Sequence, residues 1–167
     1  IAVMIGHRGR VTMIEEDLAR FVESPVMQII GTADAALRPE IGRGAGAWAS
    51  ADRQSVHLVL SAWQWPGTVA NLKANARVAV TFSRPVDYVT YQIKGEARLR
   101  AVVPEEIERS GRYLVDMVSS LMRLGIAAEI IAPWLSNRNP VLVSIAVSDI
   151  FLQTPGAKAG TRLWSAA

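Results

Sequence analysis

Short apolar runs alternate with polar segments through the middle of the chain. Two of these runs are rich in β-branched residues and have the length of strands, and the segment between them has the composition of a short helix. Pro85 and Asp87 then predict a turn, because proline fixes a turn dihedral and aspartate accepts hydrogen bonds from nearby backbone. The predicted elements are strand 56–60, helix 67–76, strand 77–82 and strand 89–99.

The flanking segments add helices and further strands. Thr12 and Glu15 have the spacing of a capping box, which predicts a helix over 13–22 with Leu18, Phe21 and Val22 turned inward. The other predicted elements are strands 26–34 and 40–50, an amphipathic helix 104–124, a helix 127–135 interrupted by proline, strand 140–154 and a glycine-rich tail 155–164.

This order of elements predicts a mainly β, α+β fold. Local hairpins favour antiparallel pairing, and several short strands with glycine-rich curvature favour a barrel, here of about six strands with flanking helices. The length of 167 residues is that of one domain. We divide it into an N-terminal helix (1–25), a barrel core (26–103), a helical insert (104–139) and a last strand with the tail (140–167).

Three glycines alternate along the strand 40–50. Gly42, Gly44 and Gly46 leave one face of that strand without side chains. The pattern indicates either a bulge or a close crossing in a curved sheet, or the close approach of a ligand. It is not a dinucleotide-binding fingerprint, because no helix follows it.

Composition narrows the possible functions. The chain has no cysteine, which excludes disulfides and thiol catalysis, and its two histidines, His7 and His57, are too far apart in sequence to suggest a metal site. No apolar run approaches the roughly 20 residues that span a membrane, and the first residues lack the pattern of a signal peptide. We therefore expect a cytoplasmic protein with no metal and no membrane partner.

Neither the charge distribution nor any catalytic motif identifies a function. Lys and Arg number 8 against 7 Asp and Glu through Ser83 and 10 against 8 afterwards, so the net charge of +3 is evenly spread and does not predict a nucleic-acid partner. No carboxylate pair or triad is present, so the catalytic residues stay unassigned. His57 is either a packed strand residue or a proton donor or haem ligand.

A succession of segments carries a family resemblance. It consists of a strand with Arg43, a strand ending in SAWQ, the run NLKANARVAVTF, a turn with proline and the strand IKGEARL. The succession resembles the pyridoxamine 5′-phosphate oxidase-like split-barrel flavoproteins over 26–99, and more loosely over 141–164. The resemblance implies a homodimer that binds FMN at its interface. The cofactor-binding residues that it implies are Arg43, Gly44, Ala45, Gly46, Ser61, Ala62, Gln64, Thr68 and Arg162.

The chain departs from the family pattern at several of these positions. Trp48 stands where the family has a basic residue, and the segment 65–68 replaces a Ser-Arg-Lys run that holds phosphate. A phosphate could instead meet the helix N-terminus and the hydroxyl of Thr68, which is otherwise an ordinary N-cap. Gly160 replaces a histidine of the family oxidases, so oxidation of vitamin B6 is not expected.

Three functions remain open. The first is an FMN-dependent oxidoreductase that acts on a small molecule, in which the cofactor carries the redox chemistry. The second is a binding module for flavin or haem without turnover. The third is a reductase that uses the deazaflavin F420 in the same groove.

Overall fold

An antiparallel barrel is the centre of the structure. In the computed structural model, which describes residues 14–166, the strand order is β3-β2-β1-β4-β5-β6, and pairing between β3 and β6 closes the barrel. The strands are β1 (Met27–Ala33), β2 (Pro39–Ala49), β3 (Ser55–Ser61), β4 (Arg77–Ser83), β5 (Thr90–Ala101), β6 (Pro140–Leu152) and β7 (Thr161–Ser165). The helices are α1 (Glu16–Glu23), α2 (Pro66–Ala74), α3 (Pro104–Arg123), α4 (Ala128–Ile131) and the 3₁₀ turn η1 (Ala132–Trp134).

Strand β6 joins the two parts of the sheet. Its 13 residues pair with β5 along most of their length, while the first half also pairs with β3 and the last residues pair with β7. Because β7 continues the sheet beyond the closed barrel, it lies outside the β3–β6 seam. The rim near Ser61 and the rim near β7 therefore lie at opposite ends of β6.

The barrel interior is filled by the inward side chains of all six strands. Alternation of buried and partly exposed residues along β1 and β4 is the pattern of strands with one covered face. The largest fully buried side chains that these strands contribute to the main core cluster are Ile30, Leu58, Leu60, Phe82, Ile93, Ile145 and Ile150. Burial of this apolar surface is the main stabilising contribution to the fold.

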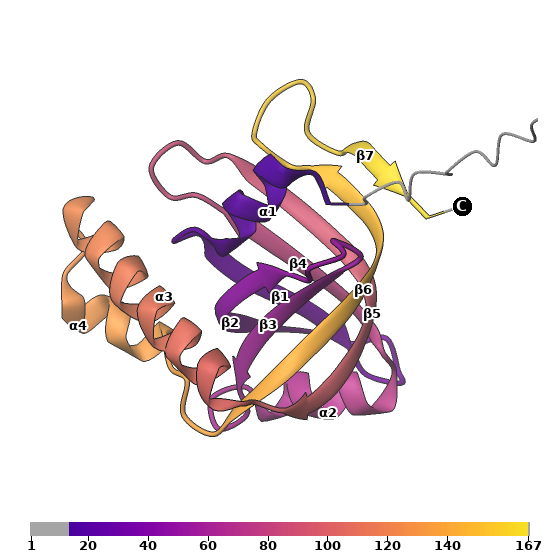
Figure 1. The fold of residues 1–167 in the computed structure, drawn as a ribbon, viewed down its shortest axis with the longest axis horizontal. Coiled ribbons are helices and arrows are strands. Elements are labelled where there is room, and N and C mark those ends of the chain that lie inside the picture. The colour runs from indigo at the N-terminus through magenta and orange to yellow at the C-terminus, as the bar shows by residue number, and fades with distance from the viewer. Residues whose placement is uncertain (1–13, 167) are drawn as a thin grey trace, which may run out of the picture.

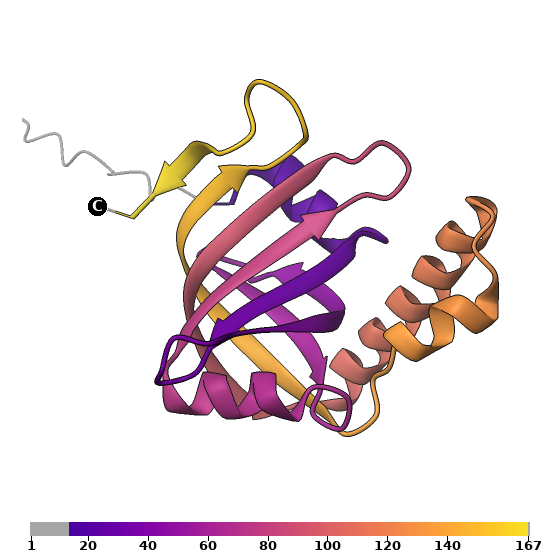
Figure 2. The same ribbon diagram turned by 180° about the vertical axis from the view of Figure 1, so that it is seen from behind.

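Helices cover the two ends and one side of the barrel. Helix α2 lies across one end and α1 lies near the other, while α3 and α4 form a hairpin beside the barrel (Figures 1 and 2). Tyr113 and Met117 of α3 pack with Ile131, and the Tyr113 hydroxyl donates to the Val26 carbonyl at 2.7 Å. Burial raises the pKa of Tyr113, so this hydroxyl stays a donor.

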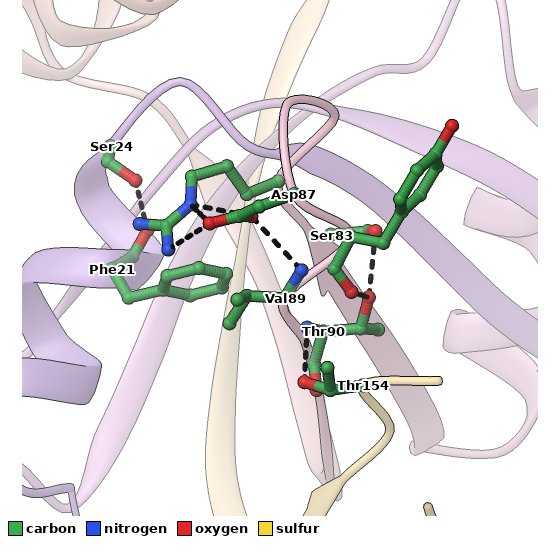
Figure 3. A network of polar contacts seen from close by, with 9 residues as sticks. Phe21, Ser24, Ser83, Asp87, Val89, Thr90 and Thr154 are labelled. Carbon is green, nitrogen blue, oxygen red and sulfur yellow. Dashed lines mark hydrogen bonds and ion pairs between the residues drawn. The ribbon is translucent and has the colours of Figure 1, made fainter. Parts of the chain in front are cut away.

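The turn between β4 and β5 forms as Pro85 and Asp87 predict. The Asp87 carboxylate accepts from the Val89 backbone N–H at 3.2 Å and pairs with the Arg84 guanidinium at 2.7 Å (Figure 3). The guanidinium of Arg84 also lies 5.3 Å from the centre of the Phe21 ring. The turn is thereby fixed to α1 at the end of the barrel.

The structure confirms the predicted fold class, an antiparallel barrel with flanking helices, and differs in detail. Helix α1 begins at Glu16, and Thr12 of the expected capping box lies outside the described residues. The expected helix 127–135 is divided into α4 and η1, because Pro133 lacks the N–H that a continuing helix needs. Strand β7 was not predicted, since its residues have little apolar periodicity. No helix in 14–166 is long and apolar enough to cross a membrane.

Candidate functional site

Arg43 points outward from β2 toward the 3₁₀ turn η1. Its guanidinium lies 5.3 Å from the centre of the Trp134 ring, and its Nη1 atom is buried without a hydrogen-bond partner. None of the carboxylates in the described part of the chain pairs with it. A buried cationic donor without an acceptor is costly, so Arg43 is suited to a ligand that supplies one.

The next residues of β2 are in contact with the protein itself. The Ala45 carbonyl accepts from the Ser110 hydroxyl at 2.6 Å, and the Gly46 N–H donates to the Gln28 side-chain oxygen at 3.0 Å. A Cβ on Gly44 would lie 2.6 Å from that same oxygen. The backbone run that sequence assigned to a cofactor therefore packs here against α3 and the barrel interior, and a bulge in the β2–β3 pairing falls within it.

Substitution of Gly46 tests this packing. Gly46 has φ +119°, and a Cβ there would lie 3.2 Å from Ser110 Cα. We expect Gly46→Ala to lower the free energy of unfolding by about 2 kcal/mol, from backbone strain and contact with α3 together. Gly125→Ala is the control, since Gly125 has φ +84° but open space around it, and only the strain of about 1 kcal/mol is expected. Equal losses in urea denaturation would contradict this account.

The bend after β3 is tied to the segment that precedes β6. The Ser61 hydroxyl donates to the Arg138 carbonyl at 2.6 Å and accepts from the Gln64 N–H at 3.2 Å. The Ala62 N–H donates to the Asn139 carbonyl at 3.0 Å. Ser61 and Ala62 therefore hold the bend in place.

One atom of the Gln64 side-chain amide has no hydrogen-bond partner among the described residues. Its Nε2 donates to the Pro133 carbonyl at 2.5 Å, which leaves the buried Oε1 without a partner. Arg43 contacts Trp134, the residue after Pro133, so the two incompletely paired side chains approach the same turn. Sequence predicted both as cofactor-binding residues, and the structure brings them to one place.

A cavity of about 550 Å³ opens beside Gln64. It is lined by Trp63, Gln64, Ala132, Pro133, Leu135 and Ser136. The Trp63 side chain is 55% exposed, and the Arg138 guanidinium lies 4.5 Å from the centre of its ring. The volume falls within the range of sites for small molecules, and the aromatic and cationic rim suits a flat, negatively charged ligand.

Thr68 does not cap helix α2. The helix begins at Pro66, a position that proline favours because its missing N–H is not needed there, and Trp65 is the N-cap. Thr68 is fully buried in the first turn, and its hydroxyl and the Trp65 indole N–H both lack partners. Both side chains lie against Gly42, where a Cβ would be 2.7 Å from the Thr68 hydroxyl oxygen.

The start of α2 also carries a carboxylate. Glu40 of β2 lies directly against Gly67, and a Cβ on Gly67 would collide with both carboxylate oxygens. No basic side chain among the described residues pairs with Glu40. Sequence reasoning did not single out Glu40, since nothing in its neighbourhood along the chain points to the start of α2.

Arg162 lies far from the other predicted site residues. It is on β7, 3.5 Å from the Asp149 carboxylate and over the Phe151 ring. Ser61 pairs with the first residue of β6, and β7 pairs with the last, so about 40 Å of strand separates them. Within one chain, the structure does not bring Arg162 to the bend.

His57 stands apart from the bend, on β3. Its Nδ1 is buried without a partner, its ring lies 5.9 Å from that of Trp48, and burial, with the nearby Arg100 charge, lowers the pKa of the imidazole. Among residues 14–166 no three metal-ligating side chains gather into a group.

The lowered pKa of His57 predicts a pH dependence of stability. Below the unfolded value of about 6.5 the unfolded chain takes up a proton before the folded chain does, so stability falls as pH drops from 6.5 toward the folded pKa. We expect His57→Gln to reduce the loss of stability between pH 7.5 and pH 5.5, because the variant lacks the group that takes up the proton on unfolding. Urea denaturation at both values checks this, and an unchanged loss would contradict it.

Known proteins share the fold of this chain. No family model and no curated protein sequence matches it, but solved structures do. A candidate pyridoxamine 5′-phosphate oxidase from Lactobacillus delbrueckii is 11% identical with a TM-score of 0.53, over 85% of this chain and 96% of its own. This chain has the pyridoxamine 5′-phosphate oxidase-like split-barrel fold.

Two other split barrels have different named functions. An F420 reductase is 16% identical with a TM-score of 0.51, over 82% of this chain and 98% of its own. HutZ, a haem storage protein from Vibrio cholerae, is 14% identical with a TM-score of 0.50, over 83% and 94%. At such identities the likeness concerns the fold alone, because one fold supports many functions.

Proposed function

We propose that this chain binds FMN at the bend after β3 and acts as an FMN-dependent oxidoreductase on a small molecule. The observation that carries the proposal is the pair of buried, unpartnered atoms, Arg43 Nη1 and Gln64 Oε1, at the turn beside the 550 Å³ cavity. A ligand with both acceptors and donors would complete their hydrogen bonds. The edge of a flavin ring has both.

The remaining residues of the site fit the same ligand. Trp63 is about half exposed and can stack on a flat ring from the face opposite Arg138, and Arg43 and Arg138 offer positive charge without a carboxylate partner in the described chain. Aromatic stacking and charge-assisted hydrogen bonds are the usual means of holding such a cofactor. The bound flavin would supply the redox chemistry, and these side chains would orient it and limit access of water.

A homodimer is part of the proposal. Arg162 is implied by the family resemblance, yet it lies at the far end of β6 from the bend. A second copy in an antiparallel arrangement would bring its own Arg162 toward the cavity. We expect light scattering to give twice the mass of the chain, and a stable monomer would count against a shared site.

A reductase that uses F420 and a non-catalytic flavin or haem carrier are the alternatives. Both alternatives are supported by solved structures of the same fold, which are named as an F420 reductase and a haem storage protein. The Glu40 carboxylate at the start of α2 would repel a phosphate there, so it also favours a ligand whose negative charge lies away from this helix.

Parallel titrations separate these functions. The full chain is titrated with FMN, F420 and haem, each followed by its absorbance spectrum, and the loaded protein is then supplied with reduced nicotinamide. We expect saturable binding of FMN at one per chain and consumption of the nicotinamide. Uptake of F420 or haem with no uptake of FMN would overturn the proposal, and FMN binding without consumption would assign the chain to the carriers.

A further inference from the structure

Glu40 places a negative charge at the start of α2. Its carboxylate lies against Gly67 in the first turn, and it reaches this position because residue 67 has no side chain. α2 has 9 residues and begins at Pro66, which has no N–H, so Gly67 and Thr68 carry the first N–H groups of the helix. Together with the helix dipole they favour a negative group, and the Glu40 carboxylate is the negative group that lies beside this turn.

No neighbouring side chain in the described part of the chain neutralises the negative charge of Glu40. Within residues 14–166 no Lys or Arg side chain forms an ion pair with Glu40. The fully buried Thr68 hydroxyl, in the same turn, has no partner. The turn therefore combines an unused buried hydroxyl with a negative charge, and a phosphate oxygen approaching Thr68 would be repelled.

We infer that Glu40 is a specificity-determining residue that occupies the anion position at the start of α2 and keeps a terminal phosphate out of it. The inference rests on the proposed function, because it concerns which part of a flavin the site accepts. Negative charge on the ligand is then met at Arg43 and Arg138, whose guanidinium groups lie over the Trp134 and Trp63 rings. The start of α2 therefore adds nothing to the affinity for FMN. The affinity for riboflavin, which lacks the phosphate, is not lowered by Glu40.

Two variants remove the negative charge from the start of α2 by different means. Glu40→Gln neutralises the side chain, and Gly67→Ala keeps the charge but displaces the carboxylate from the turn. Glu15→Gln is the control, because Glu15 is exposed beside α1 at the other end of the barrel. FMN and riboflavin are titrated against each protein by flavin fluorescence, and melting temperatures are measured without ligand.

We expect Glu40→Gln to tighten FMN binding about tenfold, as one favourable charge interaction at a helix N-terminus allows, and to leave riboflavin within twofold. Without ligand the variant should melt about 1–3 °C lower, because the helix loses its negative partner. Gly67→Ala should change FMN binding in the same direction. The control should match the wild type in both measurements.

The titrations test the role of Glu40 separately from the proposed function. Equal affinity of Glu40→Gln and wild type for FMN overturns the inference and leaves the proposed function intact. Tighter binding of riboflavin as well as FMN also overturns it, since the phosphate would not be the group affected. If neither flavin binds any of the proteins, the proposed function fails and the inference fails with it. If Gly67→Ala does not fold, Glu40→Gln alone carries the test.

Discussion

Gly95→Ala should lower the free energy of unfolding by about 3–5 kcal/mol. Gly95 lies at the bulge where the β5–β6 register shifts, and a Cβ there would collide with the Ala146 carbonyl oxygen and lie 3.0 Å from a methyl group of Ile145. Neither backbone can move away easily, because β5 and β6 are paired along most of their length. Urea denaturation followed by tryptophan fluorescence measures the loss.

Gly111→Ala is the matched control for this change. Gly111 lies within α3 and has open space where its Cβ would be, so alanine should stabilise the helix by about 0.5–1 kcal/mol. Opposite signs for the two substitutions are the expected result. A loss below about 1 kcal/mol for Gly95→Ala would mean that the β5–β6 bulge is not as tight as the structure has it.

Arg43→Met should weaken FMN binding by about 30- to 100-fold, the equivalent of about 2–3 kcal/mol. Methionine keeps most of the length and the apolar contact with the Trp134 ring, but it removes the positive charge and the buried Nη1 donor. Stability without ligand should not fall, because an unpaired buried charge is itself costly. Flavin fluorescence titration and thermal melting measure the two effects.

Arg77→Met distinguishes the local effect from a change in overall charge. Arg77 is exposed on β4, away from the bend, and pairs with no carboxylate in the described chain. This variant should bind FMN within twofold of the wild type. If both variants weaken binding equally, Arg43 acts only through the net charge, and the assigned site is wrong.

Much of the fold follows from local sequence signals. Strands β3 and β4, helix α2 and the turn at Pro85 and Asp87 form where apolar runs, proline and aspartate predict them, because each depends on residues close in the chain. Strand β7 depends on pairing with the free edge of β6. Its own residues carry no strand pattern, so only the folded sheet defines it.

The candidate site was predicted only in part, for a similar reason. Arg43 and Gln64 were found because the family resemblance covers β2 and the bend. Trp134 and Arg138 approach them through the segment before β6, far away in sequence, and no local pattern links the two segments. The glycines of β2 illustrate the reverse case, in which a pattern that favoured either a bulge or a ligand is explained in part by the close packing of α3.

The crystal structure of the full chain with FMN tests the central claim most directly. We expect the flavin ring beside Trp63 and Gln64 in the 550 Å³ cavity, with Arg43 or Arg138 within hydrogen-bond distance of the ligand. FMN bound elsewhere, for example in the groove on the outer face of β1 and β4 beside Lys94, would contradict it.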